Sequence, residues 1–429
     1  MLDELAETVI ATPYPFVLDI ARGHGMWLVT VDGQELFDWA GYFGSKLIGH
    51  NHPGLYEPDY LQHLTVAANN KVANPDFLTR ECLVYYQMLM RVAPESMRGE
   101  HLEVYAVNSG AEAVENLMKY LVAKHNAKRV SRGELPAHRR FLYFEKAFHG
   151  RTVFALGVTQ TIDTVATRDF VGLTSGGNLK LPFPSIGSEH TPHEQNQLTD
   201  HALRMVESAL MQMGPEIVGI LIEPIQGAGG QRMAQPEFFR GLSELAHQHD
   251  VYLAFDEVQT GLGATGRMFA IDHFDLPHPP MALATGKKFG CGVLYMKDHL
   301  DDIGVLDSTW GGTLADMVRV VREMEILDSE GLVQLAAVNG ERLREGLLRL
   351  AERYRPIVRN IRGMGLYQGF STDTPERKAE IVRVARDEFG LLLLGAGHVS
   401  IRTRPNLSVT AAEVDLFLDL VEQVIRRVS

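Results

Sequence analysis

Short, almost wholly apolar runs alternate with helix-type periodicity through the middle of the chain. Apolar side chains recur every three or four residues from Ala113 to Val122, which predicts an amphipathic helix. Strands that are apolar on both faces are typical of a sheet covered by helices on both sides. The alternation therefore predicts a mostly parallel α/β sheet. The predicted strands are Leu102–Val107, Phe141–Phe144, Val218–Ile222, Tyr252–Phe255, Met281–Thr285 and Gly292–Met296.

The two ends of the chain follow different patterns. The first sixty residues predict a β-rich segment, with turn signals at Gly23–Gly25 and Asp32–Gly33. After about Ser308 the pattern becomes helical, and Thr410 and Glu413 predict a capping box at the start of the last helix. We therefore predict a large domain over residues 61–308. A small domain would be built from residues 1–60 and 309–429.

Composition and charge narrow the classes of function. The 429 residues carry a formal net charge of −13, which disfavours nucleic acid as a partner. The two cysteines, Cys82 and Cys291, fit a reducing compartment and cannot form a zinc site alone, so we expect no metal. The N-terminus is acidic where a signal peptide would be basic, and no apolar run is long enough to span a bilayer. These features predict a cytoplasmic protein without a membrane partner.

The candidate chemistry begins at two predicted strand ends. Asp256 follows Tyr252–Phe255, and Lys287 follows Met281–Thr285 after one glycine. Because ligands of parallel sheets bind beyond the carboxyl ends of the strands, a carboxylate and an amine are expected in one crevice. The pair suits pyridoxal 5'-phosphate (PLP), which needs a lysine for its aldehyde and a carboxylate for its pyridine nitrogen. The alternative is a helix-capping aspartate and a lysine pair on the surface.

A phosphate site is predicted where the strand Leu102–Val107 gives way to the amphipathic helix. Free N–H groups and the helix dipole at such a start attract phosphate, and a glycine allows close approach. The residues concerned are Ser109, Gly110 and Ala111. An ordinary helix cap is the alternative.

Aromatic and basic residues complete the candidate site. Phe148 follows the strand Phe141–Phe144 and could stack on a cofactor ring, and Arg151 could clamp a carboxylate. Arg402 and Arg404 are further candidates for binding carboxylates, although an isolated arginine usually lies on the surface.

A dinucleotide motif competes with this interpretation. Gly261–Gly266 matches G-x-G-x-x-G, which would indicate a nicotinamide-dependent oxidoreductase. That motif needs a strand directly before it and a helix directly after it. Here five residues intervene after the predicted strand, and Pro277, Pro279 and Pro280 follow closely, so we disfavour it.

The motifs together resemble the class III aminotransferases, which are PLP enzymes of fold type I. Within that class the likeness is greatest to the L-lysine 6-aminotransferases, through Gly286–Val293 and Ser308–Gly312. The resemblance implies a large domain with a mostly parallel seven-stranded sheet between helices, and a small α+β domain. The matching motifs are Gly49–Pro53, Asn108–Glu112, Phe148–Arg151, Glu223–Gly227, Phe255–Gly261, Gly286–Lys287 and Arg402 before Pro405.

The resemblance also implies a role for each site residue. Lys287 would carry the Schiff base and move the proton, and Asp256 would pair with the pyridine nitrogen. Gln259 would bind the ring hydroxyl, Phe148 would stack on the ring, and Thr309 would reach the phosphate in the partner of a homodimer. The remaining roles fall to the phosphate cradle Ser109, Gly110 and Ala111, to Arg151 for the distal carboxylate, and to Arg402 for the α-carboxylate of the 2-oxo acid.

One position departs from the pattern of the lysine and ornithine enzymes. Where they have a glutamate that neutralises the equivalent of Arg402, this chain has Ala228. We predict transfer of a terminal amino group, from L-lysine or a similar diamino acid or amine, to 2-oxoglutarate or pyruvate. An amine–pyruvate transaminase with another donor, and a PLP-fold protein without transaminase activity, are the alternatives.

Overall fold

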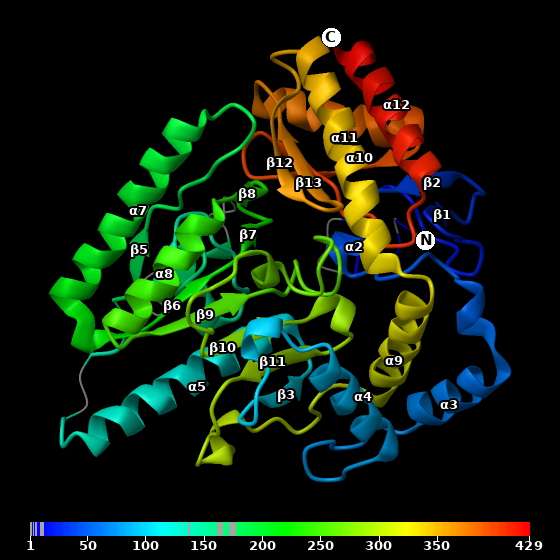
Figure 1. Cartoon of the computed structure of the whole chain (residues 1–429). Coiled ribbons are helices and arrows are strands. Elements are labelled where there is room, and N and C mark those ends of the chain that lie inside the picture. The colour runs from blue at the N-terminus through cyan, green and yellow to red at the C-terminus, as the bar shows by residue number, and fades with distance from the viewer. Residues whose placement is uncertain are drawn as a thin grey trace.

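A seven-stranded sheet forms the centre of the computed structural model, which describes residues 2, 4, 7–8, 13–135, 138–160, 166–170 and 177–429. All neighbouring strands are parallel except β11, which is antiparallel to β10 and β3. The mostly parallel seven-stranded sheet is thus confirmed (Figure 1). Its spatial order is β3 (Glu103–Val107), β11 (Gly292–Met296), β10 (Ala282–Thr285), β9 (Tyr252–Asp256), β6 (Ile217–Ile222), β4 (Arg140–Phe144) and β5 (Leu179–Leu181).

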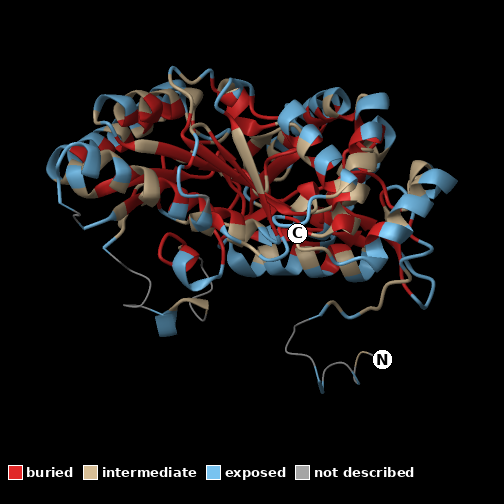
Figure 2. Cartoon of the chain, turned by 90° about the horizontal axis from the view of Figure 1, so that it is seen from below, coloured by how far each residue is buried: buried red, intermediate tan, exposed pale blue. Residues whose placement is uncertain are grey.

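Helices cover both faces of this sheet, as apolar strands require. On β9, Leu253 and Phe255 pack into the cluster that contains the inner side of α8 (Pro236–Gln248), whereas Ala254 packs with α5 (Gly110–Ser131). Figure 2 shows buried residues along the strands and exposed residues on the outer sides of the helices.

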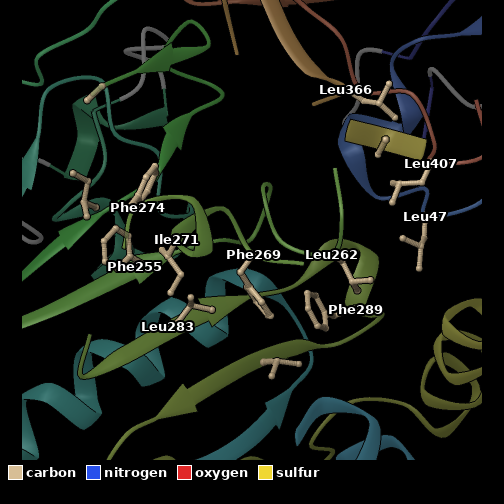
Figure 3. Close-up of a cluster of buried hydrophobic side chains, with 14 of the residues drawn as sticks. Leu47, Phe255, Leu262, Phe269, Ile271, Phe274, Leu283, Phe289, Leu366 and Leu407 are labelled. Atoms are coloured by element: carbon tan, nitrogen blue, oxygen red, sulfur yellow. The ribbon is translucent and has the colours of Figure 1, made fainter. Parts of the chain in front are cut away.

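The core continues from the sheet into the rest of the molecule. Figure 3 shows Phe255, Leu283 and Phe289 in one group of side chains that extends to Leu47 and Leu407. Residues from the start, middle and end of the chain therefore stabilise the region around the ends of β9 and β10.

The six predicted strands are present with bounds within one residue of those predicted. The seventh, β5, has only three residues, too few for a recognisable pattern. The helical pattern after Ser308 did not reveal a four-stranded sheet that lies there, whereas the small α+β domain implied by the resemblance is confirmed. Its strands are β12 (Arg359–Met364), β13 (Tyr367–Ser371), β16 (Ser400–Arg402) and β15 (Leu394–Ala396).

Both ends of the chain contribute to a further small sheet. β1 (Trp27–Val29) and β2 (Glu35–Asp38) form an antiparallel pair, and β14 (Leu391–Leu392) adds in parallel to β2. Trp39 stacks on Phe417 of the last helix at 3.7 Å between ring centroids. Division of the domains at residues 60 and 308 stays a prediction.

The remaining elements surround these sheets. Thr410 and Glu413 form the predicted capping box of α12. The helices are α2 (Gly41–Gly44, a left-handed turn), α3 (Pro58–Asn69), α4 (Arg80–Arg91), α6 (Val153–Leu156), α7 (Pro192–Met213), α9 (Leu314–Ser329), α10 (Leu332–Arg353), α11 (Pro375–Phe389) and α12 (Ala411–Val428), and a short hairpin joins β7 (Ile225–Gln226) to β8 (Arg232–Met233). Over the described ranges, no helix is both long enough and apolar enough to cross a bilayer.

Candidate active site

A cavity of about 270 Å³ opens at the carboxyl ends of β9 and β10. It brings together most of the residues predicted from the sequence, although they come from distant parts of the chain. Ser109, Thr309 and Arg402 are not part of its wall. The predicted residues that line it are Gly110, Ala111, Phe148, Arg151, Asp256, Gln259 and Lys287, together with Ala228.

Strand pairing accounts for the meeting of Asp256 and Lys287. Asp256 ends β9 opposite Ala284 of β10, and Lys287 follows β10 by two residues. Lys287 has a φ of 53°, in the left-handed region that costs a non-glycine residue about 1–2 kcal/mol. Backbone strain of this kind is concentrated at functional sites.

The surroundings of Lys287 favour its neutral amine. Burial, together with the positive charges of Arg402 and Arg404, lowers the pKa of Lys287 to about 8, although the negative charge of Asp256 opposes them. Near neutral pH, a much larger fraction of this amine is unprotonated than in an exposed lysine, and only the neutral amine attacks an aldehyde.

His149 positions the carboxylate of Asp256. Its Nδ1 lies 2.8 Å from Asp256 Oδ2, and both side chains are buried. The other carboxylate oxygen, Oδ1, accepts a hydrogen bond from the Val258 N–H at 2.9 Å. Two donors thus fix the orientation of the carboxylate and stabilise its negative charge. No role was predicted for His149 from the sequence, although it lies in the motif Phe148–Arg151.

The start of α5 packs directly against the turn that carries Lys287. A Cβ placed on Gly286 would lie 3.0 Å from Gly110 Cα, and one placed on Gly110 would lie 2.7 Å from a methyl group of Val258. Ser109 caps the helix by accepting a hydrogen bond from the Glu112 N–H. The first N–H groups of α5 therefore reach the cavity beside the lysine, where a phosphate would bind.

A second buried carboxylate, Glu223, lies behind Phe148. Glu223 Oε1 accepts a hydrogen bond from the Phe148 N–H at 2.7 Å, which fixes the backbone that presents the aromatic ring. Burial, reinforced by the negative charge of Asp256, raises the pKa of Glu223 well above its usual range. Arg151 is exposed at the rim of the same cavity.

Arg402 lies just beyond the cavity wall, at the end of β16. It is 7% exposed, and its Nη1 lies 3.4 Å from Gln259 Oε1. Across the described part of the chain, Arg402 forms no ion pair within 4 Å. Ala228 leaves the position of the absent glutamate without a charge.

Two further basic residues, Arg404 and Lys288, do not line the cavity. Arg404 is buried away from the cavity and stacks on Tyr367, so it is not positioned to bind a substrate carboxylate. Lys288 is buried rather than on the surface. Its Nζ donates to Gln259 O at 3.0 Å and to Gly44 O at 3.3 Å, and burial lowers its pKa to about 7.

The segment Gly261–Gly266 does not have the geometry of a dinucleotide site. It begins five residues after β9 ends, and only a short 3-10 turn, Ala270–His273, follows it. A Cβ on Gly263 or Gly266 would meet protein atoms at 2.6 and 2.8 Å, so these glycines serve internal packing. The alternative of a nicotinamide enzyme is therefore rejected.

Comparison with known proteins agrees with the geometry of the cavity. The family model for aminotransferase class III matches residues 9–425. The chain belongs to the class III aminotransferases. An L-lysine-epsilon aminotransferase from Mycobacterium tuberculosis is 32% identical, over 98% of this chain and 94% of the relative. An acetylornithine aminotransferase from Gloeobacter violaceus is also 32% identical, over 98% and 96%.

A solved structure supports the family assignment and the cofactor. The lysine aminotransferase from M. tuberculosis in its internal aldimine form matches with a TM-score of 0.92 and 31% identity, over 100% of this chain and 98% of that one. This class III aminotransferase is therefore a PLP-dependent enzyme of fold type I, acting on an amine donor and a 2-oxo acid acceptor.

The cavity of this aminotransferase fits PLP on its own evidence. It offers an amine with a lowered pKa, a carboxylate held in place by His149, and a helix start that a glycine allows to approach closely. Those features match the aldehyde, the pyridine nitrogen and the phosphate of the cofactor. Thr309 is exposed outside the cavity of its own chain.

Proposed function

We propose that this aminotransferase takes a terminal amino group, from L-lysine or a similar diamino acid or amine, and transfers it to a 2-oxo acid. The relative named for the ε-amine of lysine supports a terminal amine as the reacting group. The site residues support the proposal because they supply the groups that both half-reactions need.

The observation that carries the proposal is the pair of arginines at the cavity. Arg151 is exposed at its rim, and Arg402 lies buried behind Gln259 without an ion pair within 4 Å in the described residues. A buried guanidinium without a directly paired carboxylate is costly, and Glu223 acts on Arg402 only from beyond 4 Å, so Arg402 favours a carboxylate ligand. A dicarboxylic acceptor such as 2-oxoglutarate would offer one carboxylate to each arginine.

The side chains have distinct roles in the chemistry. When bound, PLP supplies an electron sink that stabilises negative charge on the carbon bearing the amine. Lys287 would act as general base, because its Nζ accepts the proton from that carbon. Asp256, oriented by His149, would keep the pyridine nitrogen protonated. Both half-reactions use the same side chains, so we expect ping-pong kinetics.

Ala228 bears on the choice of donor. Because position 228 has no glutamate to pair with Arg402, Arg402 stays available to the carboxylate of a donor. Donors that carry a carboxylate should therefore react better than diamines. A small residue at this position also keeps amines that react with pyruvate as a second candidate class of donor. The preference among donors should therefore change when a substitution places a negative charge at position 228.

The test is a panel of donors and acceptors for the wild type and two variants. The panel contains L-lysine, L-ornithine, putrescine and a simple amine, each with 2-oxoglutarate and with pyruvate. Ala228→Glu should raise kcat/KM for putrescine relative to L-lysine by about tenfold, the effect of roughly 1.4 kcal/mol. Ala228→Gln, of similar size but uncharged, should not. If only lysine with 2-oxoglutarate reacts, at rates that Ala228→Glu leaves unchanged, the argument from Ala228 fails. If no donor with a terminal amine reacts with either acceptor, the proposed function fails.

The proposal includes a homodimer with shared sites. Large apolar side chains are exposed along the N-terminal part of the chain and beside Thr309, including Phe43, Phe77, Leu78 and Trp310 at 54, 68, 80 and 38% exposure. Exposed apolar residues in such numbers favour an interface with another protein. A second copy of this chain would cover them and would bring Thr309 to the phosphate of its neighbour.

A further inference from the structure

A buried tyrosine holds the side chain of Gln259 from behind the cavity. Tyr367, on β13, is 1% exposed, and its hydroxyl donates to Gln259 Oε1 at 2.6 Å. The contact needs a glycine at position 227, because a Cβ there would lie 2.3 Å from Gln259 Oε1 and 2.4 Å from the hydroxyl. The segments that contain Gly227, Gln259 and Tyr367 are distant in sequence, and all three are needed for this one hydrogen bond.

The contact with Arg402 identifies which atom of the Gln259 amide faces Tyr367. Arg402 Nη1 lies 3.4 Å from the same amide atom that Tyr367 contacts. A guanidinium is only a donor, so the shared atom must be the acceptor oxygen. With its oxygen turned toward Tyr367 and Arg402, the amide keeps its NH₂ group for the cavity that Gln259 lines.

Arg404 holds the ring of Tyr367 in place. Its guanidinium lies 3.3 Å from the ring centroid, and its Nη2 donates to Gln231 Oε1 at 2.8 Å. Both side chains are buried, where a cation over an aromatic face contributes most. The positive charge also makes the phenol a better hydrogen-bond donor. Within the described chain, Arg404 forms no ion pair within 4 Å, so its charge is compensated by this stacking and by hydrogen bonds to Gln231 Oε1 and Thr403 O.

We propose that Tyr367, held by Arg404, is a positioning residue that fixes the Gln259 amide so that its NH₂ donates to the ring oxygen of bound PLP. The proposal rests on the role proposed for Gln259 at that oxygen. It assigns a function to two residues, Tyr367 and Arg404, that do not line the cavity.

The expected signature is spectroscopic. A hydrogen-bond donor at the ring oxygen stabilises negative charge on that oxygen. It thereby lowers the pKa of the proton that lies between the ring oxygen and the nitrogen of Lys287. Tyr367→Phe frees the amide to rotate, so the pH at which the absorbance of bound PLP changes should move upward by about half to one unit. Release of PLP on dilution should become faster by a few-fold. Arg404→Lys, which keeps the charge but loses the flat stacking face, should give a smaller shift in the same direction.

Tyr295→Phe is the matched control. Tyr295 is equally buried, but its hydroxyl donates to Leu89 O, far from Gln259 in the sequence, at 2.9 Å. The Tyr295→Phe variant should leave the absorbance titration of bound PLP unchanged. Gln259→Leu should shift the titration in the same direction as Tyr367→Phe, and the double variant should equal Gln259→Leu.

The possible outcomes separate the two proposals. If Gln259→Leu shifts the titration and Tyr367→Phe does not, the role of Tyr367 is refuted while that of Gln259 stands. If Gln259→Leu itself has no effect, the assignment of Gln259 to the ring oxygen fails, and this inference fails with it.

Discussion

At the scale of single residues, the contact between His149 and Asp256 gives the clearest prediction. The 2.8 Å hydrogen bond orients a buried carboxylate, and a hydrogen bond to a charged group contributes about 1.5–3 kcal/mol. His149→Asn should therefore lower kcat/KM about 10- to 100-fold and weaken PLP binding. Steady-state kinetics and a PLP titration of the apoprotein would measure both effects.

His125→Asn is a suitable control for that experiment. His125 is also buried, but it lies on α5 away from the cavity. Its substitution should affect thermal stability rather than turnover. Unchanged kinetics in His149→Asn would show that Asp256 does not need its histidine partner.

The lowered pKa of Lys287 predicts the pH dependence of cofactor capture. The reactive form is the neutral amine, whose fraction rises with pH up to and through the pKa. The rate at which the apoprotein incorporates PLP should therefore rise with a midpoint at pH about 8 and level off above it. Stopped-flow absorbance can follow this rate. A rate that still rises through pH 10, as for an ordinary lysine, would contradict the assigned environment.

The sequence predicted residues that end strands better than residues that support them. Asp256 and Lys287 were predictable because each lies within two residues of the end of an apolar run, and parallel strands bring such ends together. His149 lies 107 positions from Asp256, and Tyr367 lies 108 from Gln259. No local pattern encodes contacts of that separation, since they depend on how the sheets pack.

At the scale of elements, the start of α5 is the most sensitive part of the site. Gly110 leaves no room for a side chain, because a Cβ would lie 2.7 Å from Val258. Gly110→Ala should displace the helix start, cost about 1–3 kcal/mol through overpacking, and raise the dissociation constant of PLP about tenfold or more.

Gly214→Ala provides the comparison for α5. Gly214 follows α7 with a φ of −45°, and no atom lies within 4 Å of a Cβ placed there. The Gly214→Ala variant should bind PLP with the same affinity as the wild type. Equal affinity in both variants would mean that the start of α5 does not hold the phosphate.

Strands could be predicted where the local sequence is a continuous apolar run, and could not where they depend on contacts with distant residues. The central strands were recognised because each is a continuous apolar run buried on both faces. The individual strands of the four-stranded sheet were not located, and β12, which reads Arg-Asn-Ile-Arg-Gly-Met, shows why: it has no such run. Arg362 within β12 is buried, and its donors are satisfied by hydrogen bonds to backbone and hydroxyl oxygens. Only the tertiary structure can supply these acceptors.

At the scale of the whole molecule, the proposed dimer predicts complementation. Its mass should be twice the 47.7 kDa of one chain. In a mixed dimer of Lys287→Ala and Thr309→Ala chains, one site should combine an intact lysine with an intact threonine from its neighbour. Mixing the two variants after subunit exchange should therefore restore up to a quarter of the wild-type activity per total chain. No restoration in verified mixed dimers would place Thr309 in its own chain's site.

The most direct test of the account asks which amine holds the cofactor. The PLP-loaded protein would be reduced with borohydride, digested and analysed by mass spectrometry. We predict a pyridoxyl phosphate group on Lys287 and none on the adjacent, fully buried Lys288. An unmodified Lys287 in protein saturated with PLP, or a modified Lys288, would contradict the account.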